Sequence, residues 1–137
     1  MNNFEMHIPT KIIFGKKTHM QIGEIIEGYG FRRILLVYGG HSIKKTGLYD
    51  EIINSLRSSN ISFIEKGGVQ ANPTLSFCRK IIASLNDQDF DFILAVGGGS
   101  VIDTAKMIGN SIASNLDPWE ILYDGKAVTA GIPLGVV

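Results

Sequence analysis

The chain has 137 residues, which is the length of one ordinary domain with its own hydrophobic core. Hydrophobic residues make up 45% of it and charged residues 19%, so an intrinsically disordered chain is excluded. The 13 basic and 13 acidic side chains cancel, whereas a protein that binds nucleic acid would show a basic excess. Cys78 is the only cysteine, which excludes an internal disulfide.

The N-terminus and the uncharged stretches indicate where the protein is expected to reside. The first five residues have neither the basic flank nor the apolar core of a secretory signal. The longest stretch without a charged side chain, residues 67–78, is polar and too short for a membrane span. We therefore expect a cytoplasmic protein that does not bind membranes.

The chain is expected to begin with a small β-ribbon. Two short runs of strand-forming residues, 4–8 and 11–14, are separated by Pro9 and predict its two strands. Apolar residues at helical spacing then predict a helix over residues 18–29, which Gly30 ends.

From residue 33 onward, short apolar runs alternate with segments of helical periodicity. The runs predict strands over residues 33–38, 61–65 and 91–96, and a further strand that begins at Ile132. The periodic segments predict helices that begin near Gly47, at Asn72-Pro73-Thr74 and at Ser100. This order predicts an α/β fold, a Rossmann-like parallel sheet with helices on both faces.

The chain stops at Val137, inside its last apolar run. Domains rarely end on an uncapped buried strand, so we expect a fragment of a longer protein. A short edge strand that ends there is the alternative.

The clearest sign of a binding site is the segment Gly97-Gly98-Gly99-Ser100, between a predicted strand and a predicted helix. Glycines let the backbone approach a ligand, and we expect a positive φ at Gly98. A helix start offers free N–H groups and a positive dipole end, which together favour phosphate. Ser100 is expected to cap the helix and donate to phosphate, with Asp103 placed as in a capping box. Capping alone is the other interpretation of these two residues.

Known nucleotide motifs match this segment only in part. Ile102 stands where the dinucleotide fingerprint has its last glycine, and no Gly-Lys-Ser/Thr follows, which excludes a P-loop. Taken alone, the residues predict a phosphate site at a helix start.

Three stretches resemble the iron-containing alcohol dehydrogenase family. Residues 97–106 are similar to its signature, Asn72-Pro73-Thr74 to a second motif, and residues 38–50 to the butanol dehydrogenase branch in particular. The similarity covers the whole chain in the right order. It implies that residues 1–137 are the dinucleotide-binding domain of an enzyme that interconverts alcohols and aldehydes with NADP or NAD.

The resemblance also implies which residues bind the cofactor. The turn after the third strand would bind the pyrophosphate, an asparagine would lie by the adenosine half, and glycines after the first strand would flank the adenine ribose. The turn that would bind the pyrophosphate contains Gly97, Gly98, Gly99 and Ser100, with Asp103 in the helix that follows. The asparagine is Asn72. The residues of the turn that would flank the ribose are Gly39, Gly40 and Ser42.

The family's catalytic metal, divalent iron or zinc, is held by one aspartate and three histidines of a C-terminal helical domain. The resemblance implies that these ligands lie outside this chain, which alone would be inactive. His7, His19 and His41 do not match the ligands and are interpreted as surface or turn histidines. Cys78 lies on the apolar stripe of its helix, so we expect a buried small side chain rather than a nucleophile.

Two other functions stay open. One is a nucleotide-binding remnant or module without turnover, and the other is a relative of glycerol dehydrogenase or dehydroquinate synthase, which share the fold. The reading frame downstream separates enzyme from remnant, because only the enzyme needs the missing metal ligands. The expected partner is a small-molecule alcohol or aldehyde, and a homodimer is compatible with the sequence.

The turn after residue 38 predicts a preference for NADP over NAD. In dinucleotide folds an acidic side chain near a strand end binds the ribose hydroxyls, and its charge repels a 2′-phosphate. Here no acid follows the strand until Asp50, and Lys44 or Lys45 would supply positive charge. The alternative is that both lysines lie in solvent and the turn accepts NAD.

Overall fold

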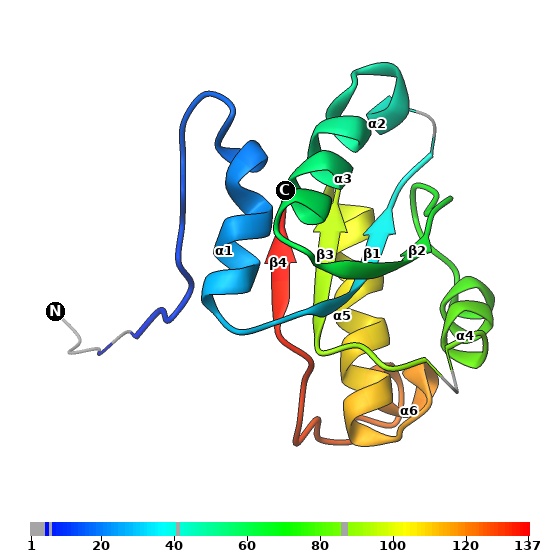
Figure 1. The fold of residues 1–137 in the computed structure, drawn as a ribbon. Coiled ribbons are helices and arrows are strands. Elements are labelled where there is room, and N and C mark those ends of the chain that lie inside the picture. Colours follow the sequence, from blue (N-terminus) through cyan, green and yellow to red (C-terminus); the bar gives the residue numbers. More distant parts are fainter. Residues whose placement is uncertain (1–4, 6, 41, 86–87) are drawn as a thin grey trace, which may run out of the picture.

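The computed structural model describes residues 5, 7–40, 42–85 and 88–137, with the backbone alone described at Ser42. Four parallel strands form its central sheet in the order β2-β1-β3-β4 (Figure 1). Their bounds are β1 Arg33–Tyr38, β2 Ser62–Lys66, β3 Phe92–Val96 and β4 Leu134–Val136. In β1 every residue after the first is buried, and in β3 all five are, which explains why both strands are apolar on both faces.

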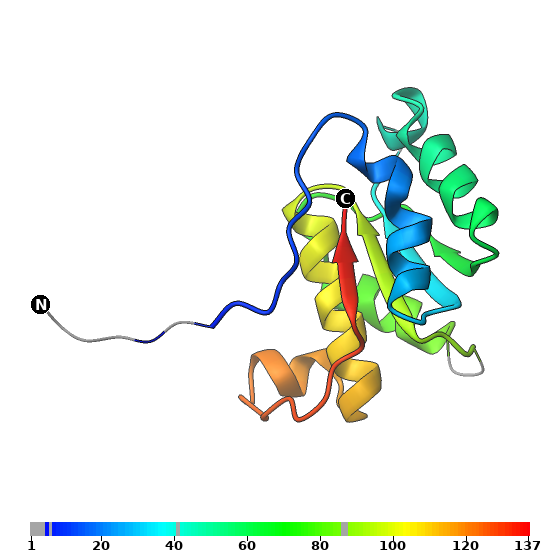
Figure 2. The same ribbon diagram turned by 60° about the vertical axis from the view of Figure 1, so that its left-hand side comes forward.

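Helices cover both faces of the sheet, as the alternating pattern predicted (Figure 2). On one face, Ile26 and Leu56 pack with Leu36 of the sheet, and on the other Ile108 packs with Leu35. The first face carries α1 and α3, and the second carries α4 and α5. The helix bounds are η1 Thr18–Gln21 (a 3-10 helix), α1 Ile22–Gly28, α2 Ser42–Lys45, α3 Leu48–Ser58, α4 Leu75–Ala83, α5 Gly99–Ser114 and α6 Pro118–Leu122.

The predicted N-terminal β-ribbon is wrong within the part of the chain that the structure describes. Residues 7–14 form no strand and run as an extended segment beside α1 (Figure 1). Ile12 is 80% exposed and Phe14 is 99% exposed, so these apolar side chains do not pack onto a neighbouring strand. An isolated two-stranded ribbon is at best marginally stable in water, and strand-forming residues alone do not supply a packed face.

Two short helices, α2 and α6, were not predicted because four or five residues are too few to show a helical period. The start of α6 nevertheless carries a clear local signal. Asp117 accepts a hydrogen bond from the Trp119 N–H, and the Glu120 carboxylate accepts one from the Asp117 N–H, which forms a capping box. Arg79 of α4 donates two 2.8 Å hydrogen bonds to the Asp117 carboxylate, and this lowers the pKa of that carboxyl. Helix α6 is thereby joined to α4.

A close contact between α1 and α3 depends on Gly23. A Cβ at this position would lie 2.1 Å from the Ser55 carbonyl oxygen, which is backbone and does not swing aside. We expect Gly23→Ala to separate the two helices and to lower the free energy of unfolding by about 3 kcal/mol. Urea denaturation measures the change, and Gly28→Ala in the same helix is the control because its Cβ would meet no atom within 4 Å. Equal stability of the two variants would contradict this contact.

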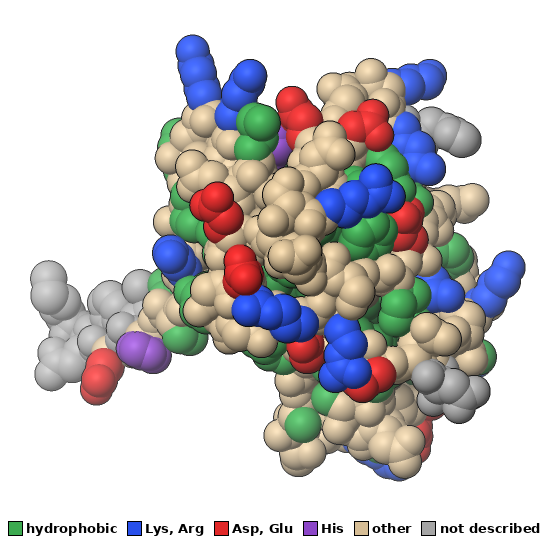
Figure 3. Space-filling view, in the orientation of Figure 1, with side chains coloured by type: hydrophobic (Ala, Val, Ile, Leu, Met, Phe, Trp, Pro, Cys, Tyr) green, Lys and Arg blue, Asp and Glu red, His purple; other side chains and the backbone are tan. Residues whose placement is uncertain are grey.

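Basic and acidic side chains are interspersed over the face shown in Figure 3, in keeping with the absence of net charge. None of the helices in the described part of the chain has the length and hydropathy of a membrane span.

Candidate functional site

The glycine groups that the sequence separates by more than fifty residues meet at the carboxyl edge of the sheet. Tyr38, the last residue of β1, is the register partner of Val96, the last residue of β3, so Gly39 and Gly97 follow neighbouring strands. The loop after β2 lies against the first of these turns, because the Gly68 N–H donates to the Gly39 carbonyl at 3.0 Å. Three chain segments therefore form one edge.

The position of this edge in the topology favours ligand binding. The chain passes from β1 to β2 on one side of the central β1–β3 pair and from β3 to β4 on the other, so the helical connections leave the carboxyl ends of β1 and β3 in opposite directions. In open parallel sheets, ligands bind in the crevice outside such a switch point.

The turn after β3 leaves open space next to its backbone. A Cβ at Gly98 or Gly99 would meet no atom within 4 Å, and both residues are exposed. The positive φ expected at Gly98 is wrong: Gly98 has φ −78° and ψ −172°, an extended conformation that any residue adopts. The glycine that the turn requires is Gly97, whose φ is 144° and whose Cβ would lie 2.8 Å from the Val101 side chain.

The N-terminus of α5 faces this open space without a side-chain cap. Gly98 is the N-cap residue, and its carbonyl accepts from the N–H groups of Val101 and Ile102. The N–H groups of Gly99 and Ser100, in the first turn, have no acceptor within the helix. With sixteen residues, α5 adds the positive end of its dipole at this point. The arrangement fits an anionic ligand such as phosphate.

The capping interpretation of Ser100 and Asp103 is wrong, because the helix begins one residue earlier than predicted. Ser100 is the second residue of α5 rather than its N-cap, and its carbonyl accepts a 2.7 Å hydrogen bond from the Thr104 hydroxyl. Asp103 lies one turn further along α5 with an exposed side chain. A glycine gives no side-chain signal for an N-cap, so the sequence favoured the first residue that can cap.

The other predicted cofactor residues lie on the neighbouring turns. Gly39 is half-buried, and its Cβ would be in ordinary contact with Val101 of α5 at 3.6 Å. Gly40 is exposed and open. Asn72 lies in the loop between β2 and α4 with a left-handed φ of 54°. Ser42 begins α2, its side chain is outside the described residues, and so is all of His41.

A tyrosine pair beside this edge was missed at the level of the sequence. The hydroxyls of Tyr38 in β1 and Tyr49 in α3 both donate to the same Glu65 oxygen of β2, at 3.0 and 2.8 Å. Burial first, and then the carboxylate, raise the pKa of Tyr38 and raise that of Tyr49 to about 12. These residues lie in three different elements, so only the fold brings their side chains together.

The tyrosine pair predicts a loss of stability at high pH. The pKa of Tyr49 is about 12 in the folded chain and near 10 when unfolded, so folding is favoured while the hydroxyl stays protonated. We expect the free energy of unfolding to fall as the pH rises from about 10 to about 12. Urea denaturation across this range measures it, and Tyr49→Phe should flatten the decline. An equally steep decline in the variant would contradict the assignment.

The structure shows the surroundings of His7, His19 and Cys78. His19 forms a 2.6 Å pair with Glu51, which joins η1 to α3, and His7 is exposed. Cys78 is buried as expected, and burial raises the pKa of its thiol, which makes it a poor nucleophile. Across residues 5, 7–40, 42–85 and 88–137, no three His, Cys, Asp or Glu side chains come together as they would around a metal ion.

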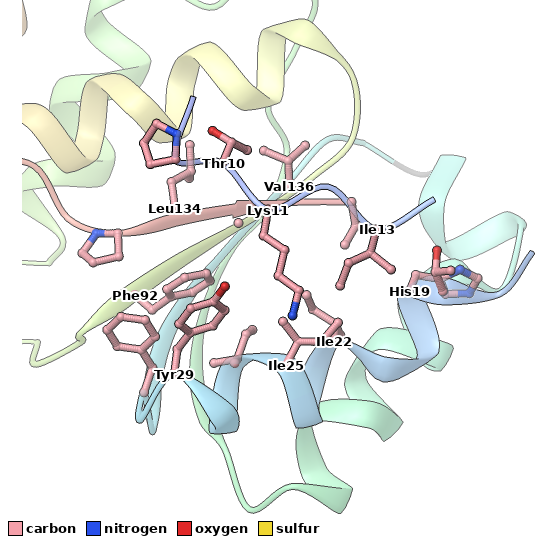
Figure 4. A pocket seen from close by; sticks show the side chains of 17 residues that line it. Thr10, Lys11, Ile13, His19, Ile22, Ile25, Tyr29, Phe92, Leu134 and Val136 are labelled. Atoms are coloured by element: carbon pink, nitrogen blue, oxygen red, sulfur yellow. The ribbon is translucent and has the colours of Figure 1, made fainter. Parts of the chain in front are cut away.

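An apolar pocket of about 490 Å³ lies elsewhere, between the N-terminal segment, α1 and β4 (Figure 4). Ile13, Ile22, Phe92 and Leu134 point into it, together with the stem of Lys11. None of the predicted cofactor residues that the structure describes lines this pocket. The glycine edge is therefore separate from this pocket.

Most of the chain matches one known protein family. Residues 9–137 match the family described as iron-containing alcohol dehydrogenase. The chain belongs to this family.

Relatives of the iron-containing alcohol dehydrogenase family are similar over the entire chain. NADH-dependent butanol dehydrogenase A of Clostridium acetobutylicum is 39% identical over 137 residues, which are 100% of this chain and 35% of the relative. NADPH-dependent aldehyde reductase YqhD of Escherichia coli is also 39% identical, over 140 residues and the same shares. The chain thus spans about a third of the length of these relatives.

Solved structures of the family have the same fold. The crystal structure of NADH-dependent butanol dehydrogenase A from Thermotoga maritima superposes with a TM-score of 0.94 at 38% identity, covering 99% of this chain and 34% of that one. The resemblance to the butanol dehydrogenase branch is therefore confirmed.

Proposed function

We propose that this chain is the cofactor-binding part of an NAD(P)-dependent alcohol dehydrogenase that interconverts an alcohol and its aldehyde. The family match and the named activities of the relatives support the reaction class. The observation that carries the binding role is the uncapped N-terminus of α5 beside the open Gly98, at the switch point of the sheet.

Each part of the edge has a role in this proposal. The N–H groups of Gly99 and Ser100 bind the pyrophosphate, and Gly97 turns the backbone so that they face it. The Gly39-Gly40 turn receives the adenine ribose, with Asn72 near the adenosine half. When bound, the nicotinamide carries the hydride, and this chain contributes its orientation.

The metal implied by the family does not fit the described residues, because they bring no three ligand side chains together. The physiological substrate is proposed only as a small alcohol or aldehyde, and the cytoplasmic location and the homodimer stay predictions.

The proposal predicts cofactor binding without turnover by this 137-residue chain. We expect calorimetric titration with NADP or NAD to show one site per chain, no stoichiometric iron or zinc by elemental analysis, and no oxidation of butanol. Absence of binding to either cofactor would overturn the binding role. Measurable turnover, or one tight metal ion per chain, would show that the catalytic groups lie in this chain.

A further inference from the structure

Four side chains from four elements form a charged cluster beside the Gly39-Gly40 turn. The Lys44 ammonium of α2 lies 5.6 Å from the ring centre of Tyr38 and 4.8 Å from that of Tyr49, within the range of a cation–π contact. Both hydroxyls of these rings donate to Glu65. The two rings therefore have the positive charge of Lys44 over their faces and the negative charge of Glu65 at their hydroxyls.

The negative charge of this cluster is linked to the proposed ribose site through the side chain of Tyr38. Glu65 accepts a 3.0 Å hydrogen bond from the Tyr38 hydroxyl, and the Gly39-Gly40 turn follows Tyr38 directly in the chain. The Tyr38 ring is also fixed against the loop after β2, because a Cβ at Gly67 would lie 2.4 Å from it. Glu65 lies at the surface of the molecule. An acid near this strand end opposes a 2′-phosphate.

We propose that Lys44 is a specificity-determining residue, which offsets the charge of Glu65 so that the Gly39-Gly40 turn accepts a cofactor with a 2′-phosphate. This inference rests on the proposed cofactor site. Lys44 is held on the two rings, so its charge acts by offsetting Glu65 rather than by contacting the phosphate. Two charges separated by no more than about a Debye length, ~8–10 Å, still interact at physiological salt. NAD has no 2′-phosphate and is expected to be nearly indifferent to the cluster.

The test compares the dissociation constants of NADP and NAD for Lys44→Met, Glu65→Gln and the double variant. We expect Lys44→Met to weaken NADP binding by about three- to tenfold at low salt, with less than a twofold change for NAD and a smaller effect at high salt. Glu65→Gln should strengthen NADP binding, and the double variant should return close to the wild type. A double variant as weak as Lys44→Met would show direct phosphate contact and overturn the inference.

Two further variants separate charge from structure. Lys80→Met removes an equal charge from the exposed surface of α4 and should leave the ratio of the two constants unchanged. Tyr49→Phe keeps the ring beneath Lys44 but removes one donor to Glu65, and should lower NADP affinity without changing that of NAD. If the wild type binds neither cofactor, the proposed function itself fails. If it binds and the ratio is the same in all variants, only this inference fails.

Discussion

Gly98→Val should abolish cofactor binding and leave the fold intact. The valine side chain would project into the open space beside the α5 N-terminus, where no protein atom lies within 4 Å of the new Cβ. The backbone at Gly98 is extended, with φ −78°, so valine adopts it without strain. We expect cofactor affinity to fall at least about 100-fold, or ~2.7 kcal/mol, while the free energy of unfolding changes by less than about 1 kcal/mol.

Calorimetric titration with NADP and NAD measures the loss, and circular dichroism with urea denaturation checks the fold. Gly28→Val is a matched control, because a Cβ there also meets open space but lies at the end of α1. It should bind cofactor as the wild type does. Unchanged affinity in a folded Gly98→Val variant would show that the pyrophosphate is not bound at this turn.

A valine at Gly97 tests a different property of the same turn. Gly97 has a φ of 144°, and its Cβ would lie 2.8 Å from Val101, so a side chain there disturbs the turn itself. Loss of binding in such a variant would not separate a blocked site from a misfolded one. Gly98 is therefore the informative position.

The fold could be predicted where local patterns carry it. Strands β1 and β3 are buried on both faces, so five- or six-residue apolar runs between turn residues identify them directly. The N-terminal segment has the same kind of residues but no neighbouring strand in the described structure, and its side chains are exposed. Strand formation there would require a partner, which a local pattern does not reveal.

The candidate site also has one part that the local sequence predicts and another that only the fold brings together. The open turn at Gly97 to Gly99 is local, so its sequence predicted a helix start next to open backbone, although not which glycine has the positive φ. The tyrosine pair and Glu65 come from β1, α3 and β2, and their contact depends on parallel register across the sheet. Glu65 lies on the strand adjacent to β1 rather than in the residues that follow β1, so the local sequence does not reveal it as the acid near this strand end.

The presence of Glu65 near this strand end leaves the predicted preference for NADP unchanged, although it alters the physical reason for it. The Glu65 carboxylate accepts from two hydroxyls, and Lys44 lies over the same rings, so Lys44 is not free to contact the cofactor as the sequence suggested. Lys45 is the remaining exposed lysine of α2. The relatives named as NADH-dependent and NADPH-dependent are both 39% identical to this chain, so overall similarity does not decide between the cofactors.

We expect tighter binding of NADP than of NAD, and a reversal of this preference in Gly39→Asp. A Cβ at Gly39 would make only ordinary contacts, 3.6 Å to Val101 and 3.7 Å to the Val69 carbonyl oxygen, so the backbone leaves room for the first atom of the aspartate side chain. Its carboxylate would accept from the ribose hydroxyls of NAD and repel the 2′-phosphate of NADP. Gaining one such hydrogen bond, or removing one such repulsion, changes the affinity about tenfold, or by ~1.4 kcal/mol.

Parallel titrations of the wild type and Gly39→Asp with both cofactors, at one ionic strength, measure the switch. Gly39→Asn is the control, because it has nearly the same size and hydrogen-bonding reach but no charge. If repulsion of the phosphate sets the preference, the asparagine variant keeps more of its NADP affinity than the aspartate variant does. Should both variants lose NADP equally, the preference depends on the space that glycine leaves and not on charge. Equal wild-type affinities, or tighter NAD, would contradict the predicted preference, and Gly39→Asp would then have little preference to reverse.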